Sequence, residues 1–186
     1  MSPYILLVKS TIETYIKEGK IISPPEDLPE EFFKQKSGTF VTIEKDGKLR
    51  GCIGTYLALR QNIAQEIISN AIAAVAEDYR FGPVQKEELS HLSYTVYILG
   101  EPELVKDLKE LDPKKYGIIV KTLPITGPSS DVVFNGHLPY KSGLLLPDLK
   151  GIDTIEKQIS IACQKGRINP IREKIFIYKF TVEKHQ

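Results

Sequence analysis

The segment that most constrains the fold is residues 39–54, which the sequence predicts to be a β-hairpin. Thr39–Glu44 is a run of β-branched and aromatic residues, the composition that favours a strand. Asp46 and Gly47 follow, and this dipeptide is typical of the tight turn between two antiparallel strands. The chain then doubles back into a second strand from Lys48, and we expect the other elements to be organised around that strand.

The second strand carries an arginine, a cysteine and two glycines where ordinary packing gives little reason for them. If side chains alternate along it, Arg50 and Cys52 project from the same face, and the residues between and beside them take the other. The guanidinium would then lie beside the sulfur. Because the thiolate is the reactive form of cysteine, a neighbouring positive charge lowers the thiol pKa and activates it.

The two glycines of this strand, Gly51 and Gly54, remove side chains, so that a ligand or another backbone can approach closely. The structural alternative is that Cys52 is a small buried hydrophobe and that the glycines mark a bulge. From these residues alone, both interpretations stay open.

The run Leu49–Thr55, followed by a long predicted helix and then by Asp78–Pro83, resembles the AMMECR domain family, whose hallmark is Leu-Arg-Gly-Cys-Ile-Gly-Thr. Every residue of that hallmark matches. The resemblance is strong over residues 39–105, extends through residues 116–120 and 143–147, and is weak in the C-terminal quarter. The chain departs from the family in having Gly-Pro after Arg-Phe, where two prolines are usual, and in lacking a tryptophan near the C-terminus.

The resemblance implies a role without naming a reaction, because the family has no agreed biochemical activity. Bacterial relatives are similar to the A component of the AmmeMemoRadiSam system, in which AMMECR, Memo-like and radical-SAM-like proteins occur together. The implied role is therefore a component of an enzyme system, with Memo-like and radical-SAM-like proteins as partners. Eukaryotic relatives have been discussed as regulatory or nucleic-acid-associated proteins, which is a different class of function. The resemblance also implies that Asp78 and Arg80 line the same pocket as the cysteine.

We predict that these residues form a pocket for a small anionic or carbonyl-bearing ligand. Cys52 would be the nucleophile or a ligand contact, and Arg50 would lower its pKa or bind an anion. The remaining ligand-binding residues would be Gly51, Gly54, Thr55, Asp78 and Arg80. The alternative is a non-catalytic protein-interaction or regulatory module, in which the same motif is the packed scaffold of a docking surface. Whether the protein is an enzyme therefore stays open.

Composition narrows the class of protein. With 186 residues and 41% apolar content, the chain has room for one AMMECR-like domain over residues 1–186, with part of it as a small subdomain. The formal net charge of +1 does not favour RNA or other nucleic-acid binding, which is the weakest alternative. The N-terminus has no basic region, and its apolar run stops too early for a signal peptide or membrane span. We therefore expect a cytoplasmic protein with Cys52 and Cys163 reduced.

The rest of the chain alternates predicted helices and strands, which indicates an α+β fold with a mixed, largely antiparallel sheet and helices packed on it. Amphipathic helices are predicted at residues 3–18 and 62–78 from the period of their apolar residues. The further predictions are a helix or turn at 104–111, a helix at 153–164 in which Cys163 packs, and strands at 93–99, 116–122, 143–146 and 175–182.

At the end of the second predicted helix, Glu77 and Asp78 oppose the negative end of the helix dipole and favour a nearby cation. Arg80 is the nearest cation in sequence, and Arg50 is the alternative. The sequence favours a structural interpretation, which is either an ion pair or a solvated helix end.

Residues 123–142 are dense in Pro, Gly, Ser and Asn and form an unusually long connection, which is typical of a lid or an irregular surface loop. His137 lies in it, so a Cys52–His137 nucleophile and base pair is one hypothesis. No metal site is predicted, because the three histidines are far apart and no Cys-x-x-Cys occurs. No cofactor is predicted either, since there is no Walker A or Gly-x-Gly-x-x-Gly run.

Overall fold

The computed structural model describes residues 1–123 and 140–186, so His137 and most of the predicted 123–142 loop lie outside the described residues. Within the described ranges the chain divides into two compact units. The first comprises residues 1–100 and 183–186, and the second comprises residues 101–182. The prediction of one domain with a small subdomain stays a prediction.

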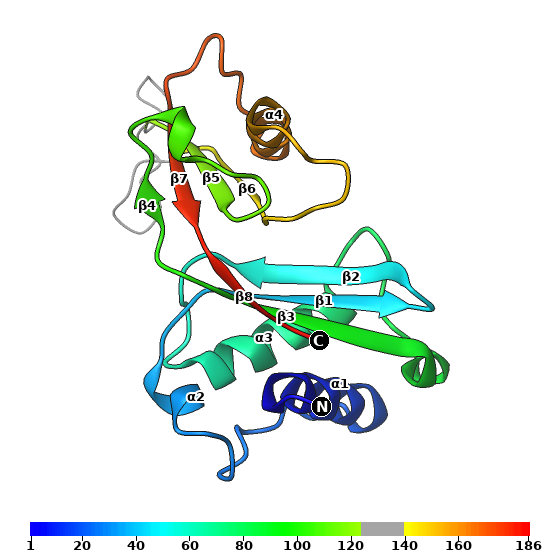
Figure 1. The fold of residues 1–186 in the computed structure, drawn as a ribbon. Coiled ribbons are helices and arrows are strands. Elements are labelled where there is room, and N and C mark those ends of the chain that lie inside the picture. Colours follow the sequence, from blue (N-terminus) through cyan, green and yellow to red (C-terminus); the bar gives the residue numbers. More distant parts are fainter. Residues whose placement is uncertain (124–139) are drawn as a thin grey trace, which may run out of the picture. The chain divides into compact units, whose positions relative to one another are not determined.

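The first unit is a four-stranded sheet with two long helices on one face (Figure 1). The strand order is β2-β1-β3-β8. Its elements are α1 (Pro3–Glu18), α2 (Glu31–Lys34), β1 (Thr39–Lys45), β2 (Lys48–Thr55), α3 (Ile63–Ala76), the 3-10 helix η1 (Lys86–His91), β3 (Leu92–Leu99) and β8 (Val182–His185).

Local sequence explains where the two long helices begin and end. The hydroxyl of Ser2 accepts a hydrogen bond from Ile5 N–H at the start of α1, and Gly19 ends it in the left-handed conformation (φ 68°). At the start of α3, the side chain of Asn62 accepts from Gln65 N–H (3.0 Å). Both amphipathic helices are therefore where the sequence predicts them, with α3 ending two residues early.

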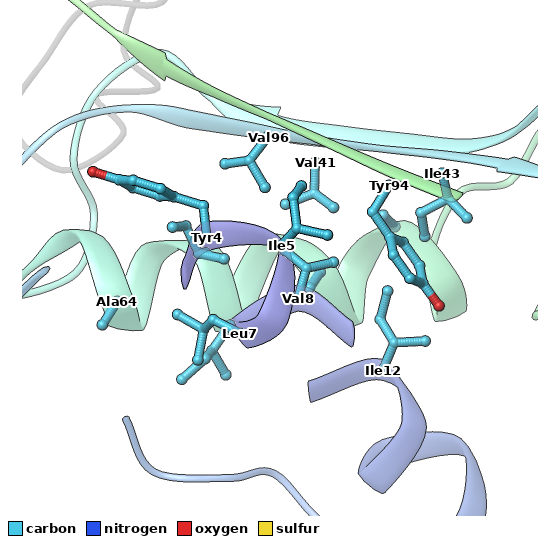
Figure 2. Close-up of a cluster of buried hydrophobic side chains, with 14 of the residues drawn as sticks. Tyr4, Ile5, Leu7, Val8, Ile12, Val41, Ile43, Ala64, Tyr94 and Val96 are labelled. Carbon is cyan, nitrogen blue, oxygen red and sulfur yellow. The ribbon is translucent and has the colours of Figure 1, made fainter. Parts of the chain in front are cut away.

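The core of the first unit lies between the helices and the sheet (Figure 2). Val8 and Ile12 of α1 face Val41 and Ile43 of β1, and all four side chains are fully buried. Fully burying one such side chain contributes about 1.5–3 kcal/mol, so this layer fixes which face of the hairpin points inward.

The hairpin forms as predicted, but with a bulge. Asp46 and Gly47 both have positive φ (49° and 74°), as a tight hairpin turn requires. Ile43 lies opposite Gly51 and Glu44 opposite Leu49, so Arg50 is the extra residue of β2. The prediction of strict alternation through Arg50 is therefore wrong, because a bulge interrupts the period of two.

The second unit is another four-stranded sheet, in the order β4-β7-β5-β6, with one helix packed on it. Its core contains Ile118, Val120 and Cys163, which confirms packing as the place of that cysteine. The α+β class with antiparallel pairing is confirmed, with two sheets in place of one. Its elements are β4 (Glu103–Leu104), the 3-10 helix η2 (Leu108–Glu110), β5 (Gly117–Thr122), β6 (Ser142–Leu145), α4 (Ile155–Lys165) and β7 (Ile175–Phe180).

Candidate functional site

The backbone of Cys52 is bound by the Asp78–Arg80 pair. Cys52 N–H donates to Asp78 Oδ2 (2.9 Å), and Arg80 Nη2 donates to the Cys52 carbonyl (3.1 Å). The pair is itself closed by two contacts from the guanidinium to the carboxylate, at 2.9 and 2.7 Å. β2 is an edge strand, so the outward N–H and C=O of Cys52 lie where another strand could hydrogen-bond. Asp78 and Arg80 bind both groups and so prevent strand pairing at this residue.

Asp78 is an ionised structural carboxylate. It is only 3% exposed, and the hydrogen bond from Arg80 lowers its pKa from the usual 3.8 to about 2, against an opposing effect of burial. The Cys52 N–H adds to the lowering. The predicted Asp78–Arg80 ion pair is therefore present, and both residues lie at the cysteine.

Cys52 is partly exposed, and its sulfur accepts a hydrogen bond from Oγ1 of Thr42, which lies directly opposite on β1 (3.3 Å). Arg80 is a cation close to this residue, since its Nη2 donates to the Cys52 carbonyl. Its pKa is raised chiefly by the hydrogen bond to Asp78, with burial opposing, and the charge of Cys52 adds to the increase. A cation that interacts with the charge of Cys52 is thus Arg80, which follows α3 in the chain.

Arg50, the extra residue of the bulge, makes four hydrogen bonds elsewhere. Its Nε and Nη2 donate to the two carboxylate oxygens of Glu88 (2.9 and 2.8 Å), which is the bidentate geometry of a strong pair. Nη1 and Nη2 also donate to the carbonyls of Gly82 and Pro83 (3.0 and 3.1 Å). Arg50 therefore ties β2 to the segment 82–88, and it does not pair with Asp78 as the sequence allowed.

Glu88 is a site residue that the sequence did not indicate, since it lies in a polar stretch with no distinguishing pattern. The hydrogen bond from Arg50 lowers its pKa from 4.5 to about 2, against burial, with further contributions from Gln85 N–H and Lys45. Glu88 is thus ionised whenever the protein is folded near neutral pH.

The lowered pKa values of Asp78 and Glu88 make the free energy of unfolding depend on pH. Since both pKa values are lower in the folded chain, their stabilisation is complete above about pH 4.5 and is lost as the pH falls towards 2. Asp78→Asn should therefore lower the free energy of unfolding at pH 7 by about 2 kcal/mol and reduce its slope between pH 5 and 2. Urea unfolding across this range measures both. Asp27→Asn, at an exposed turn, is the control, and an unchanged slope in Asp78→Asn would contradict the expectation.

Thr55, the last residue of the motif, belongs to a buried polar network that the sequence analysis did not predict. Glu66 of α3 is 1% exposed and accepts from Thr55 Oγ1 (2.6 Å) and from the N–H groups of Leu59 and Arg60 (2.8 and 2.7 Å). Asn70, one turn further on, donates to Thr55 Oγ1 (3.4 Å). The available signal was two polar residues, four apart, on the apolar face of a helix.

The glycines of the motif allow close packing. A Cβ on Gly51 would lie 2.4 Å from the carbonyl oxygen of Ala74 in α3. A Cβ on Gly54 would lie 2.3 Å from the ring of Phe40 and 2.4 Å from the carbonyl oxygen of Thr39. The sequence allowed either a ligand or another part of the protein to approach these glycines. In the structure, neighbouring protein groups occupy the space beside both of them.

The turn after α3 presents large side chains to solvent. Tyr79 is 93% exposed and Phe81 is 37% exposed, while the Arg80 guanidinium lies 5.2 Å from the centre of the Phe81 ring.

In the part of the chain that the structure describes, no three His, Cys, Asp or Glu side chains gather as a metal-binding group. Among the same residues, no helix is long and apolar enough to cross a membrane.

Comparisons with known proteins agree on the family. The AMMECR1 family model matches residues 5–185. A protein of Thermotoga maritima is 46% identical over 99% of this chain and 97% of its own length. A protein of Clostridium acetobutylicum is 41% identical over 99% of this chain, which spans only 36% of that relative. The crystal structure of the uncharacterised protein PH0010 from Pyrococcus horikoshii matches with a TM-score of 0.80 and 31% identity, over 97% of this chain and 88% of PH0010. With its hallmark run at residues 49–55 and a family match over nearly its whole length, this chain belongs to the AMMECR1 family.

Proposed function

We propose that this chain is a protein-interaction module, in which residues 49–55 are the scaffold and the turn Asp78–Phe81 docks a partner protein. The supporting observation is how the motif uses its polar groups. The side chains of Arg50, Thr55 and Asp78 are engaged by contacts within the protein. The aromatic ring that follows them, Tyr79, is almost fully exposed.

The chemistry of the turn suits a protein partner. Tyr, Arg and Phe are enriched in protein interfaces, where a few such side chains provide most of the binding energy. Arg80 is held by Asp78 and by the Cys52 carbonyl, so the backbone of the turn is fixed before a partner arrives. Such preorganisation reduces the entropy lost on association.

The partners that we propose are the Memo-like and radical-SAM-like proteins of the same organism, which the family resemblance implies. On this proposal, any metal cluster and any bond-breaking step belong to the partner. The role of this chain is to bind it.

The test is to measure binding of each partner by isothermal titration calorimetry to the intact chain and to a Tyr79→Ala/Phe81→Ala double variant. We expect binding to weaken at least tenfold in the double variant, because truncation of an interface aromatic costs more than about 1.4 kcal/mol. Ile171→Ala is the matched control, since Ile171 is 94% exposed but lies in the second unit. Equal loss in the control, or none in the double variant, would contradict the proposal.

The second candidate is the small-ligand pocket with a reactive Cys52, which would take an anionic or carbonyl-bearing ligand. It is supported by the Thr42 hydroxyl on the sulfur and by Arg80 nearby. A reactive thiol should be alkylated by iodoacetamide at pH 7 much faster than a free thiol and more slowly in Arg80→Gln. Cys163 is the internal control, because burial raises the pKa of its thiol. The docking proposal instead expects ordinary reactivity of Cys52 and unchanged partner binding in Cys52→Ser.

A further inference from the structure

A hollow of about 880 Å³ lies along α1 and β3 in the first unit, away from the motif. One wall is a single stripe of α1, formed by side chains four residues apart: Ile5, Lys9, Glu13 and Lys17. The other wall contains four consecutive residues of β3, Leu92–Thr95. Since successive side chains of a strand point to opposite faces, four consecutive lining residues mean that the hollow runs along the edge of β3.

The outer neighbour of β3 is β8, which covers only part of that edge. β8 has four residues and β3 has eight. Lys184 lies over the ring of Tyr97 (6.0 Å), and Gln186 Nε2 donates to Thr95 Oγ1 (3.3 Å). The residue numbers rise along one strand as they fall along the other, so β8 runs antiparallel beside the C-terminal half of β3.

The register of β3 with β1 shows which backbone groups of β3 point towards its outer edge. His91 accepts from Asp46 N–H (3.2 Å), and Leu99 N–H donates to Gly38 (3.0 Å). The odd-numbered residues of β3 therefore pair with β1, and the even-numbered ones turn their N–H and C=O outward. Tyr94 is even-numbered and lies before the part covered by β8. Its backbone N–H and C=O thus face the hollow, with no strand partner in residues 1–123 and 140–186.

We propose that this groove binds an extended polypeptide segment of a partner protein, which adds to β3 as an antiparallel strand in line with β8. The chain itself provides the precedent, since β8 occupies the same edge in the same manner. The two edges of the sheet differ in this respect. At the β2 edge, Asp78 and Arg80 bind the N–H and C=O of Cys52. At Tyr94, beyond the end of β8, no strand among residues 1–123 and 140–186 occupies the edge of β3.

The charges of the groove indicate what kind of segment fits. Three cationic and three anionic side chains line it, and Glu13 already bridges two of the cationic ones, Lys9 (3.9 Å) and Lys17 (2.7 Å). The charges of the lining side chains therefore balance. The segment should have no net charge, and its main-chain hydrogen bonds should carry the binding, so salt should affect it little. The charged lining residues are Lys9, Lys17, Lys86, Glu13, Glu44 and Glu87.

The test begins with a phage-displayed library of random nine-residue peptides, selected on the intact chain. Enriched peptides are synthesised with single backbone N-methyl groups, and their affinity is measured by fluorescence anisotropy. In a strand, alternate N–H groups point towards the neighbouring strand. Methylation at alternate positions near the pairing point should therefore weaken binding about tenfold, and methylation between them less than about twofold. Salt between 50 and 500 mM should change affinity less than about twofold.

Two extended chains provide the matched control for the same peptides. Adding Thr-Val-Thr after Gln186 should lengthen β8 past Tyr94 and abolish peptide binding, while adding Gly-Ser-Gly should leave it unchanged. The Tyr79→Ala/Phe81→Ala variant should bind the peptides as the original chain does, because this site is independent of the proposed docking turn.

Several results would overturn the inference. They are a library without enriched peptides, binding that ignores N-methylation, and equal binding to both extended chains. A fourth result is a concentration-dependent dimer in analytical ultracentrifugation that the Thr-Val-Thr extension abolishes. It would show that the edge of β3 binds a second copy of this chain, and it would overturn the proposal that a partner protein binds there.

Discussion

Glu66→Ala should lower the free energy of unfolding by about 3 kcal/mol or more, because three hydrogen-bond donors lose their acceptor in a largely buried setting. The donors are the hydroxyl of Thr55 and the N–H groups of Leu59 and Arg60. Each unsatisfied buried donor costs about 1–3 kcal/mol, and water entering from the exposed loop should recover part of that cost. Guanidinium unfolding at pH 7 measures the difference.

The matched control is Glu77→Ala, in which an exposed glutamate just beyond α3 is removed. Its effect should be within about 0.5 kcal/mol, as for most surface substitutions. Glu66→Gln should fall between the two, because the amide keeps the shape and one acceptor oxygen but turns an NH₂ group towards donors. If Glu66→Ala were as stable as Glu77→Ala, the buried network would not anchor the end of the motif.

Gly51→Ala should destabilise the first unit by about 3 kcal/mol or more, because the new methyl group would meet backbone that has no room to move. Its Cβ would lie 2.4 Å from the carbonyl oxygen of Ala74, between β2 and α3. A shift of β2 would also stretch the contacts of Cys52 with Asp78 and Arg80, so partner binding at the turn should weaken in parallel. Thermal unfolding and the calorimetric titration measure the two effects.

Gly82→Ala separates this clash from backbone strain. Gly82 has positive φ (70°), and a Cβ there meets nothing within 4 Å, so alanine should cost only about 1–2 kcal/mol. Gly51 is not among the residues with positive φ, and its cost is therefore one of space. Equal destabilisation by the two substitutions would show that β2 and α3 can separate at a cost no greater than the backbone strain at Gly82.

The sequence by itself determined the local elements. Asp46 and Gly47 predicted the hairpin turn because few residue pairs tolerate two successive positive φ angles. The helix 3–18 followed from the period of its apolar residues, and Gly19 ends it where the sequence placed the end. The hallmark run identified the family without any coordinates. These features depend on residues adjacent in the chain, whose steric preferences act before any distant contact forms.

Only the tertiary structure decided what the motif does with its side chains. The bulge at Arg50 depends on the pairing of β2 with β1, and the partner of Arg50, Glu88, is 38 residues away. The place of Thr55 depends likewise on Glu66, which reads from the sequence as an ordinary helix glutamate. Each contact joins groups that come close only after the sheet and α3 have packed. No local pattern encodes such a partner, because a hydrogen bond between distant residues is selected by the folded geometry and not by the neighbours of either residue.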